Sequence, residues 1–289
     1  MDAAEQSRTR RRARPKRIAR QAILAIARRL AGPFILETTW LAVTRPQVAL
    51  AGLPPAWDGA TVALLADLHA GNRLGWDYLR RVVGVVNDAR PDVVALVGDF
   101  INWYGHATPE LVEVLGELRA GEGRFAVLGN HDHRADAAGV TDALGAAGID
   151  VLSNAHRLLS RDGQTLCLAG VDDYRRGRPD ARAALTGVPQ ATPRVLLCHN
   201  PDYAEDLPPA LRVDLMLCGH THGGQIRPPA GSAPFLSIRY RKYGQGLVRG
   251  PRCWVYITRG IGTAHLPLRL NCRPELPILT LRRAVRRPS

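Results

Sequence analysis

The sequence has no uninterrupted apolar run long enough to cross a membrane. A spanning helix needs roughly 18 or more consecutive apolar residues, and the most apolar N-terminal stretch is interrupted by Arg28, Arg29 and Glu37. A secretory signal needs an apolar core and a cleavage site of small residues, and neither is clear here. The arginines at 10–12 lack a following apolar core, so a twin-arginine signal is poorly supported. We therefore expect a cytoplasmic protein, with a peripheral position at the inner face of the membrane or an exported location left open.

Paired cysteines are also missing. The chain has five cysteines, an odd number, and they are widely spaced with no C-x-x-C motif: Cys167, Cys198, Cys218, Cys253 and Cys272. Two of them end apolar runs, in "VLLC" and "LMLC". We interpret all five as buried small residues and not as a disulfide framework, which favours a reducing compartment.

Acidic residues are scarce at the N-terminus. The chain carries a formal charge of +13, and residues 1–30 contribute ten basic side chains but only Asp2 and Glu5 as acids, a net +8. The whole chain is 46% hydrophobic by composition, and the part after residue 30 is long enough for a large folded domain. The sequence therefore divides into a basic arm, residues 1–45, and a main domain, residues 46–289.

The arm has the spacing of an amphipathic helix. Apolar side chains recur on one side, at Ile23, Ile26, Ala27, Leu30 and Phe34, and basic side chains lie on the other. Such a helix suits an anionic membrane surface, so residues 1–36 are a candidate membrane-binding segment. A helix that packs on its own domain is an equal alternative. Nucleic acid is an unlikely partner, because no interleaved aromatic residues or known binding module accompany the charge.

The main domain has short apolar runs that alternate with helical patterns. Strands are expected at 61–67, 91–99 and 124–130, with helices at 76–89, 108–119 and 134–147. The second half favours strands, at 165–170, 194–198, 213–218, 253–258 and 276–281, and a long surface loop at 227–251. This order predicts an α/β protein with two sheets in a sandwich and helices on the outer faces.

Polar side chains follow five of these apolar runs. They form D-x-H at Asp67 and His69, G-D at Asp99, G-N-H-D at Asn130, His131 and Asp132, H at His199, and G-H-T-H at His220 and His222. One such signal is usually a turn or a helix cap. Five together predict a site, because the carboxyl ends of parallel strands lie at one edge of a sheet. The adjacent Gly219, Gly223 and Gly224 would let backbone approach it closely.

The donor types indicate which metals would bind. Carboxylates, an amide oxygen and imidazoles without thiolate suit Mn²⁺, Fe or Zn²⁺. The set is too large for one ion with an open position, so we expect two divalent ions about 3.5–4 Å apart that share a carboxylate and a bridging hydroxide. That arrangement is suited to in-line displacement at phosphorus.

The ordered motifs between residues 67 and 222 resemble those of the calcineurin-like metallophosphoesterase superfamily. "GHTHGGQ" and the segment "RGIGTAHLPLRLNCRPELPILTL" look like its bacterial phosphodiesterase branch, as does segment 37–54, so the resemblance covers residues 37–281. The resemblance implies two ligand sets that share Asp99. The first is Asp67, His69 and His222, and the second is Asn130, His199 and His220.

The resemblance also implies the roles of the remaining motif residues. Asn130 and His131 would contact the substrate, His131 would stabilise charge or protonate the leaving oxygen, and Asp132 would orient His131. Some relatives carry a carboxylate shortly after G-D, where this chain has Asn102.

The resemblance implies a binuclear metal-dependent phosphodiesterase or pyrophosphohydrolase, and its phosphoester substrate is lipid-linked or nucleotide-activated if the arm binds membrane. The alternatives are a non-catalytic scaffold protein on the same fold, which would lack ligands, and a nuclease, which would need an extended basic face.

Several polar residues near the motifs are expected to be structural. We predict a solvated loop position for His133, surface or structural positions for His106, His156 and His265, and a turn with ordinary ion pairs for Asp172 and Asp173. The arginines at 175, 176 and 178 could bind an anionic substrate or be solvated loop charges.

Overall fold

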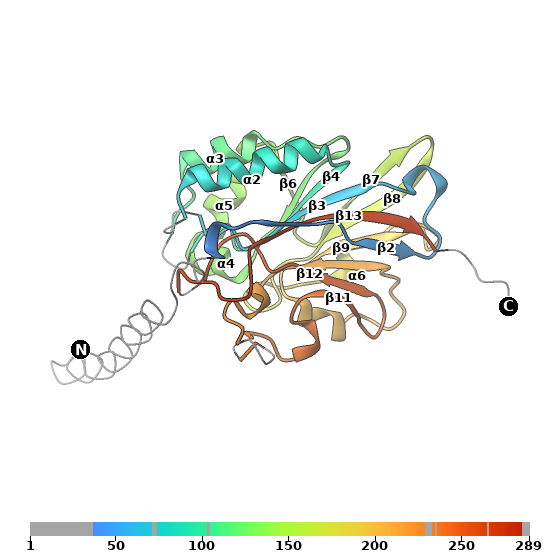
Figure 1. Ribbon diagram of the computed structural model, residues 1–289. Helices are drawn as coiled ribbons and strands as arrows, with labels where there is room; N and C mark the ends of the chain where they lie inside the picture. Colours follow the sequence, from blue (N-terminus) through green and yellow to red (C-terminus); the bar gives the residue numbers. More distant parts are fainter. Residues whose placement is uncertain are drawn as a thin grey trace, which may run out of the picture. The chain divides into compact units, whose positions relative to one another are not determined.

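The computed structural model describes residues 37–70, 74–102, 105–228, 233–234, 236–264 and 266–284. In that part of the chain, two β-sheets pack against each other with helices on their outer faces (Figure 1). This confirms the predicted α/β sandwich. The amphipathic helix predicted within residues 1–36 and the surface position predicted for residue 265 lie outside the described residues.

The first sheet has the strand order β1-β13-β3-β4-β5-β6, and β2 also pairs with β13. Strands β3 to β6 are parallel to one another, whereas β13 is antiparallel to β3. The segment 37–54 contributes β1 and β2, which both run parallel to β13. The strands are β1 (Ala42–Thr44), β2 (Gln47–Leu50), β3 (Thr61–Leu65), β4 (Val93–Val97), β5 (Gly123–Val127), β6 (Asp150–Val151) and β13 (Glu275–Arg283).

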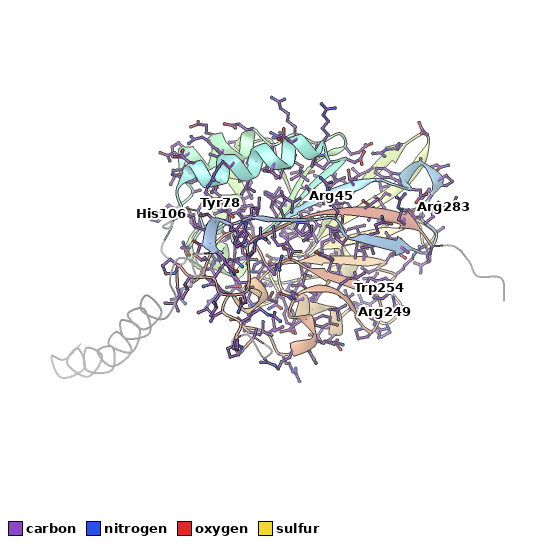
Figure 2. The ribbon with its side chains drawn as sticks, viewed as in Figure 1. Arg45, Tyr78, His106, Arg249, Trp254 and Arg283 are labelled. Atoms are coloured by element: carbon purple, nitrogen blue, oxygen red, sulfur yellow. The ribbon has the colours of Figure 1, made fainter. Side chains whose placement is uncertain are left out.

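The second sheet has the order β11-β12-β10-β9-β8-β7. Its strands are β7 (Ala155–Arg161), β8 (Gln164–Gly170), β9 (Arg194–Leu197), β10 (Leu215–Cys218), β11 (Gly246–Arg249) and β12 (Trp254–Ile257). The prediction of a loop throughout 227–251 is wrong for β11. This strand lies at the sheet edge and is partly exposed, so it has no apolar run to mark it. The Arg249 guanidinium lies 5.2 Å from the centre of the Trp254 ring on the neighbouring strand (Figure 2).

The helices of the first half connect the strands of the first sheet. They are α2 (Trp76–Ala89), α3 (Pro109–Gly116), α4 (Asn130–Ala135) and α5 (Ala137–Ala146), and a short α6 (Ala181–Ala184) follows in the second half. The single helix predicted at 134–147 is therefore two helices. They separate at Asp136, whose backbone is extended (φ −164°) and whose carboxylate accepts a hydrogen bond from Gly139 N at 3.0 Å, capping α5.

Short 3₁₀ helices occupy several loops and the ends of some strands. They are η2 (Glu37–Thr39), η3 (Pro55–Trp57), η4 (Pro201–Glu205), η5 (His222–Gly224) and η6 (Arg241–Tyr243). Within the described residues, no helix is both long and apolar enough to span a membrane.

Each central strand is buried on both faces. In β3, Ala63 and Leu65 pack with the helices, whereas Val62 and Leu64 pack against the second sheet. This explains the unbroken apolar runs in the sequence. All five cysteines are buried and free, as predicted, and four of them pack on the outer side of the second sheet.

Candidate metal centre

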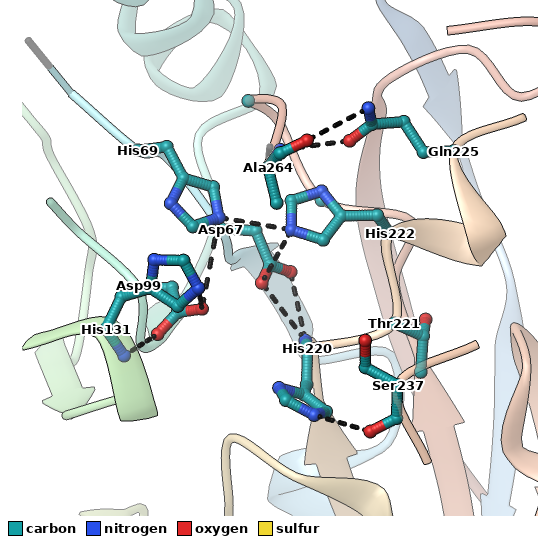
Figure 3. A network of polar contacts seen from close by, with 12 residues as sticks. Asp67, His69, Asp99, His131, His220, Thr221, His222, Gln225, Ser237 and Ala264 are labelled. Carbon is teal, nitrogen blue, oxygen red and sulfur yellow. Dashed lines mark hydrogen bonds and ion pairs between the residues drawn. The ribbon is translucent and has the colours of Figure 1, made fainter. Parts of the chain in front are cut away.

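The polar ends of the central strands meet at one edge of the sandwich. Asp67 and His69 follow β3, Asp99 follows β4, and His131 lies in the first turn of α4 after β5. From the second sheet, residues after β9 and β10 reach the same place, and Figure 3 shows side chains from both sheets in one network of contacts. The structure therefore brings together residues that are up to 155 positions apart in the printed sequence.

The first group contains Asp67, His69 and His222, whose ligand atoms all lie within 4.8 Å of one another. The Nε2 atoms of the two histidines are 3.1 Å apart, and His222 Nε2 lies 3.5 Å from Asp67 Oδ1. Two imidazole nitrogens bound to one ion at about 2.1 Å are roughly 3.0–3.4 Å apart. The first group therefore has the spacing of ligands on a single ion.

The second group contains Asp99, His199 and His220. His199 Nε2 is 3.3 Å from Asp99 Oδ2 and 3.1 Å from His220 Nδ1. The outer ring nitrogens are held by backbone carbonyls, because His199 Nδ1 lies 2.7 Å from Val97 O and His220 Nε2 lies 3.1 Å from Ser237 O. Such contacts orient an imidazole and direct its other nitrogen towards a metal.

Asp99 lies between the two groups. Its Oδ2 is 3.3 Å from His199 Nε2 and 3.9 Å from both His69 Nε2 and His131 Nε2. Asn130, which directly precedes His131, is buried, and its Oδ1 has no hydrogen-bond partner among the described residues. A buried amide oxygen without a partner costs free energy unless it binds something. Oxygen and nitrogen donors without thiolate fit a divalent metal ion.

Left-handed backbone conformations are concentrated in the predicted ligands. Positive φ angles occur at Asp67 (54°), His69 (46°), Asp99 (57°), His220 (69°) and His222 (51°). A non-glycine residue rarely adopts this conformation, and each instance stores about 1–3 kcal/mol. Hydrogen bonds hold the conformations, since Asp67 N donates to Gly98 O, His69 N donates to Asp99 O, and Asn102 Nδ2 donates to His69 O.

Two glycines let the ligand segments approach closely. A Cβ atom at Gly129 would lie 2.3 Å from Asp99 Oδ1, and one at Gly219 would lie 2.7 Å from Asp67 Oδ2. Both distances are far below van der Waals contact. The prediction that glycine allows close approach therefore holds at Gly219, and Gly129 has the same function beside Asp99.

Asp132 is fully buried and supports the segment that carries Asp99. Its Oδ2 accepts hydrogen bonds from Asp99 N (2.8 Å) and Gly129 N (2.9 Å). Its Oδ1 accepts from Phe100 N (2.9 Å) and Ile101 N (3.1 Å). The sequence motif contains this carboxylate but does not reveal these partners, and the orientation of His131 by Asp132 remains a prediction.

Burial and neighbouring charges set the pKa values of the metal-free site. Burial raises the pKa of Asp67 to about 7, against the opposing effect of His199 and Arg269. Burial alone would raise the pKa of Asp99, but the charge and the hydrogen bond of His199, together with the charges of His69 and His131, outweigh burial and hold the pKa well below its ordinary value. Burial would lower the pKa of His199, whereas Asp99 and Asp67 raise it to about 10. Burial and His199 together lower the pKa of His220 to about 3, so this imidazole is neutral, the form that binds metal.

Some residues that were expected in solvated loops or ordinary turns are buried and make specific polar contacts. His133 is not a solvated loop residue, because its Nε2 lies 2.6 Å from Asp172 Oδ1 and its side chain is mostly buried. Asp173 is fully buried, and its Oδ2 accepts hydrogen bonds from two backbone amides in the next turn. His106 is exposed (Figure 2), and His156 Nδ1 contacts a backbone carbonyl, as expected for surface and structural positions. The side chains of the arginines at 175 and 176 are exposed.

Comparisons with known proteins agree with the geometry. A family model described as calcineurin-like phosphoesterase matches residues 60–224, more than half of the chain. The uncharacterized metallophosphoesterase YkuE of Bacillus subtilis is 32% identical over 256 residues, which cover 86% of this chain and 87% of that protein. Phosphodiesterase YaeI of Escherichia coli is 33% identical over 231 residues, which cover 76% of this chain and 81% of that protein.

A longer relative also matches. A Danio rerio protein named transmembrane protein with metallophosphoesterase domain is 33% identical over 251 residues, which cover 82% of this chain but 56% of that protein. The match therefore spans little more than half of that relative. The matched family model and the two bacterial relatives show that the chain belongs to the calcineurin-like phosphoesterase family. Its clustered acidic and histidine side chains form a candidate site for divalent metal.

Proposed function

We propose that the chain is a binuclear metal-dependent phosphodiesterase or pyrophosphohydrolase. The observation that carries the proposal is the position of Asp99, whose Oδ2 faces histidines of both ligand groups. When bound, two divalent ions lower the pKa of water and neutralise charge on the phosphoryl oxygens. The seven residues that would hold them are Asp67, His69 and His222 for one ion, Asn130, His199 and His220 for the other, and Asp99 for both.

His131 is the proposed proton donor. Its Nε2 lies 3.9 Å from Asp99 Oδ2, and its ring packs edge-on against His69 with 4.7 Å between centroids. The side chain is mostly buried beside both ligand groups. From this place its imidazolium would stabilise charge on a phosphoryl oxygen or protonate the leaving oxygen.

The membership of the bacterial phosphodiesterase branch is also a proposal. It is supported by the similarity to YaeI and by the sequence "GHTHGGQ" at residues 219–225. Mn²⁺, Zn²⁺ and Fe are the proposed metals, because the donor set is oxygen and nitrogen without thiolate.

The test compares hydrolysis of bis-p-nitrophenyl phosphate and p-nitrophenyl phosphate. Metal-stripped protein is re-supplied with Mn²⁺, Zn²⁺ or Mg²⁺, and Asp99→Ala and His131→Ala are assayed beside the exposed control His106→Ala. We expect metal-dependent cleavage of the diester, lost in Asp99→Ala, reduced roughly 10²-fold or more in His131→Ala and unchanged in His106→Ala. Cleavage of the monoester alone would contradict the diesterase assignment, and absence of both metal binding and activity would favour the scaffold alternative.

We also propose that residues 1–36 bind an anionic membrane surface and that the substrate is a lipid-linked phosphate or a nucleotide-activated lipid precursor. The support is the net +8 charge of residues 1–30 and the apolar spacing within them. The chain without residues 1–36 should no longer sediment with vesicles that contain phosphatidylglycerol. Unchanged sedimentation and unchanged turnover of lipid substrates would refute this part of the proposal.

A further inference from the structure

Arg269 is a fully buried arginine whose guanidinium donates to backbone carbonyls. Burial of a cation is costly unless hydrogen bonds compensate it. The acceptors are Gly262 O (2.7 Å), Arg259 O (2.8 Å), Cys272 O (3.0 Å), Gly260 O (3.2 Å) and His222 O (3.4 Å). One side chain thus joins residues 259–262, residue 272 and the carbonyl of a proposed metal ligand.

The loop 259–262 packs directly on Asp67. Gly262 N donates to Asp67 O at 2.8 Å, and a Cβ at Gly262 would lie 2.2 Å from Leu68 O. A Cβ at Gly260 would lie 2.8 Å from Asp67 Cβ. The loop therefore packs closely against Asp67, and Arg269 holds the loop through the carbonyls of both glycines.

The segment of His222 is tied to the same loop. The carbonyl of His222 accepts hydrogen bonds from the Arg269 guanidinium and from Cys272 Sγ, the latter at 3.2 Å. Three residues later, Gln225 exchanges hydrogen bonds with Ala264, with its Nε2 3.1 Å from the carbonyl and its Oε1 2.9 Å from the amide (Figure 3). His222 has a left-handed backbone, so its side-chain direction depends on these contacts.

We propose that Arg269 is a positioning residue for the first metal ion, holding Asp67 and His222 in the spacing that one ion requires. The inference rests on the proposed function. A planar guanidinium offers five donors in a fixed fork, and this is what joins several carbonyls at once. Lysine keeps the charge but has three donors on one atom, so it cannot satisfy the same set.

Arg194 provides a matched control. It is also buried, with 3% exposure, and it donates to the backbone carbonyls of Val188 (2.8 Å), Pro189 (3.2 Å) and Arg212 (3.2 Å). It begins β9, whereas the ligand of this strand, His199, follows its other end. Replacing Arg194 therefore removes comparable hydrogen bonds at a distance from the metal ligands.

The experiment measures Mn²⁺ binding to metal-stripped, full-length protein by titration calorimetry for Arg269→Lys, Arg269→Gln and Arg194→Lys. Variants His222→Ala and His220→Ala identify the binding step of each site. We expect Arg269→Lys and Arg269→Gln to weaken the step assigned through His222 by roughly 10-fold or more and to leave the other step within about 2-fold. Arg194→Lys should lower the urea midpoint of the metal-free protein without changing either step.

The outcomes separate the two proposals. Wild-type protein that binds no Mn²⁺ would refute the proposed function itself. Two-step binding in wild type that Arg269→Lys and Arg269→Gln leave unchanged, or that Arg194→Lys weakens equally, would overturn the role of Arg269 alone. If Arg269→Lys fails to fold, Arg269→Gln carries the same comparison, and failure of both while Arg194→Lys folds and binds normally would assign Arg269 to overall stability and overturn the proposal.

Discussion

Replacing Asp132 with asparagine should destabilise the metal-free protein strongly. Each carboxylate oxygen accepts two backbone N–H groups, from Asp99 and Gly129 on one side and from Phe100 and Ile101 on the other. Asparagine retains one oxygen, so its amide N–H₂ must face two of these donors. Two hydrogen bonds are lost and two buried N–H groups are left without acceptors.

The magnitude follows from the number of lost hydrogen bonds. A buried hydrogen bond to a charged group contributes about 1.5–3 kcal/mol, so the free energy of unfolding should fall by about 3–6 kcal/mol. This loss is a large part of the free energy of unfolding of a typical domain, which is about 5–15 kcal/mol. Whichever side the amide nitrogen takes, at least one hydrogen bond to the segment 99–101 is lost, so the variant should also bind Mn²⁺ more weakly.

Asp173→Asn is the matched comparison. Asp173 is also fully buried, but both of its amide donors, Arg175 N and Arg176 N, bind Oδ2. Its Oδ1 has no hydrogen-bond partner among the described residues. Asparagine can place its nitrogen there and keep both hydrogen bonds, so the expected loss is under about 1 kcal/mol.

The assay is urea unfolding of the three metal-free proteins at pH 8. This pH lies above the pKa of Asp132, which burial raises to about 7, so both of its oxygens are acceptors. A loss of under 1 kcal/mol in Asp132→Asn would refute the reasoning, as would equal losses in the two variants.

Two further predictions concern backbone approach and acid stability. Gly129→Ala places a Cβ 2.3 Å from Asp99 Oδ1 and 2.5 Å from Asp99 N, so Mn²⁺ affinity and diesterase activity should both fall at least tenfold; calorimetry showing wild-type affinity would contradict this. Burial alone would raise the pKa of Asp92, but hydrogen bonds from Thr61 and Arg161 lower it below its ordinary 3.8. Its stabilising effect is therefore present above about pH 4 and lost as the pH falls further. When the urea midpoint is plotted against pH, Asp92→Asn should make the decrease at acid pH less steep. An unchanged decrease would exclude this contribution of Asp92.

The central sheet and the clustering of the proposed ligands could be predicted from the sequence because their signals are local. Helix α2 was predicted with its observed bounds, Trp76–Ala89, since its apolar face is regular. In the structure Arg90 ends the helix in a left-handed conformation. The edge strands β7 and β11 have no such signal, because one face is exposed and the apolar run is absent. The division of α4 from α5 depends on the cap at Asp136, which the helical pattern conceals.

The supporting groups of the site could not be found in the same way. Arg269 lies 47 positions from His222, and no spacing rule connects an arginine to backbone carbonyls at that separation. The contact of His133 Nε2 with Asp172 Oδ1 likewise joins α4 to the loop after β8 through tertiary structure alone. Residue type indicated what the ligands could do, whereas the partners that position them depend on the folded chain.

The left-handed conformations explain why these supporting groups are needed. Glycine would relieve the strain at five of the seven proposed ligands, yet glycine has no side chain to bind a metal. The strained conformations must therefore be held by their surroundings. Asp132 holds the amides that follow β4, and Arg269 holds the carbonyls of the loop after β12 that packs on Asp67. In the proposed metal centre, rigidity would thus depend on one buried carboxyl group, Asp132, and one buried guanidinium, Arg269, neither of which is a proposed ligand.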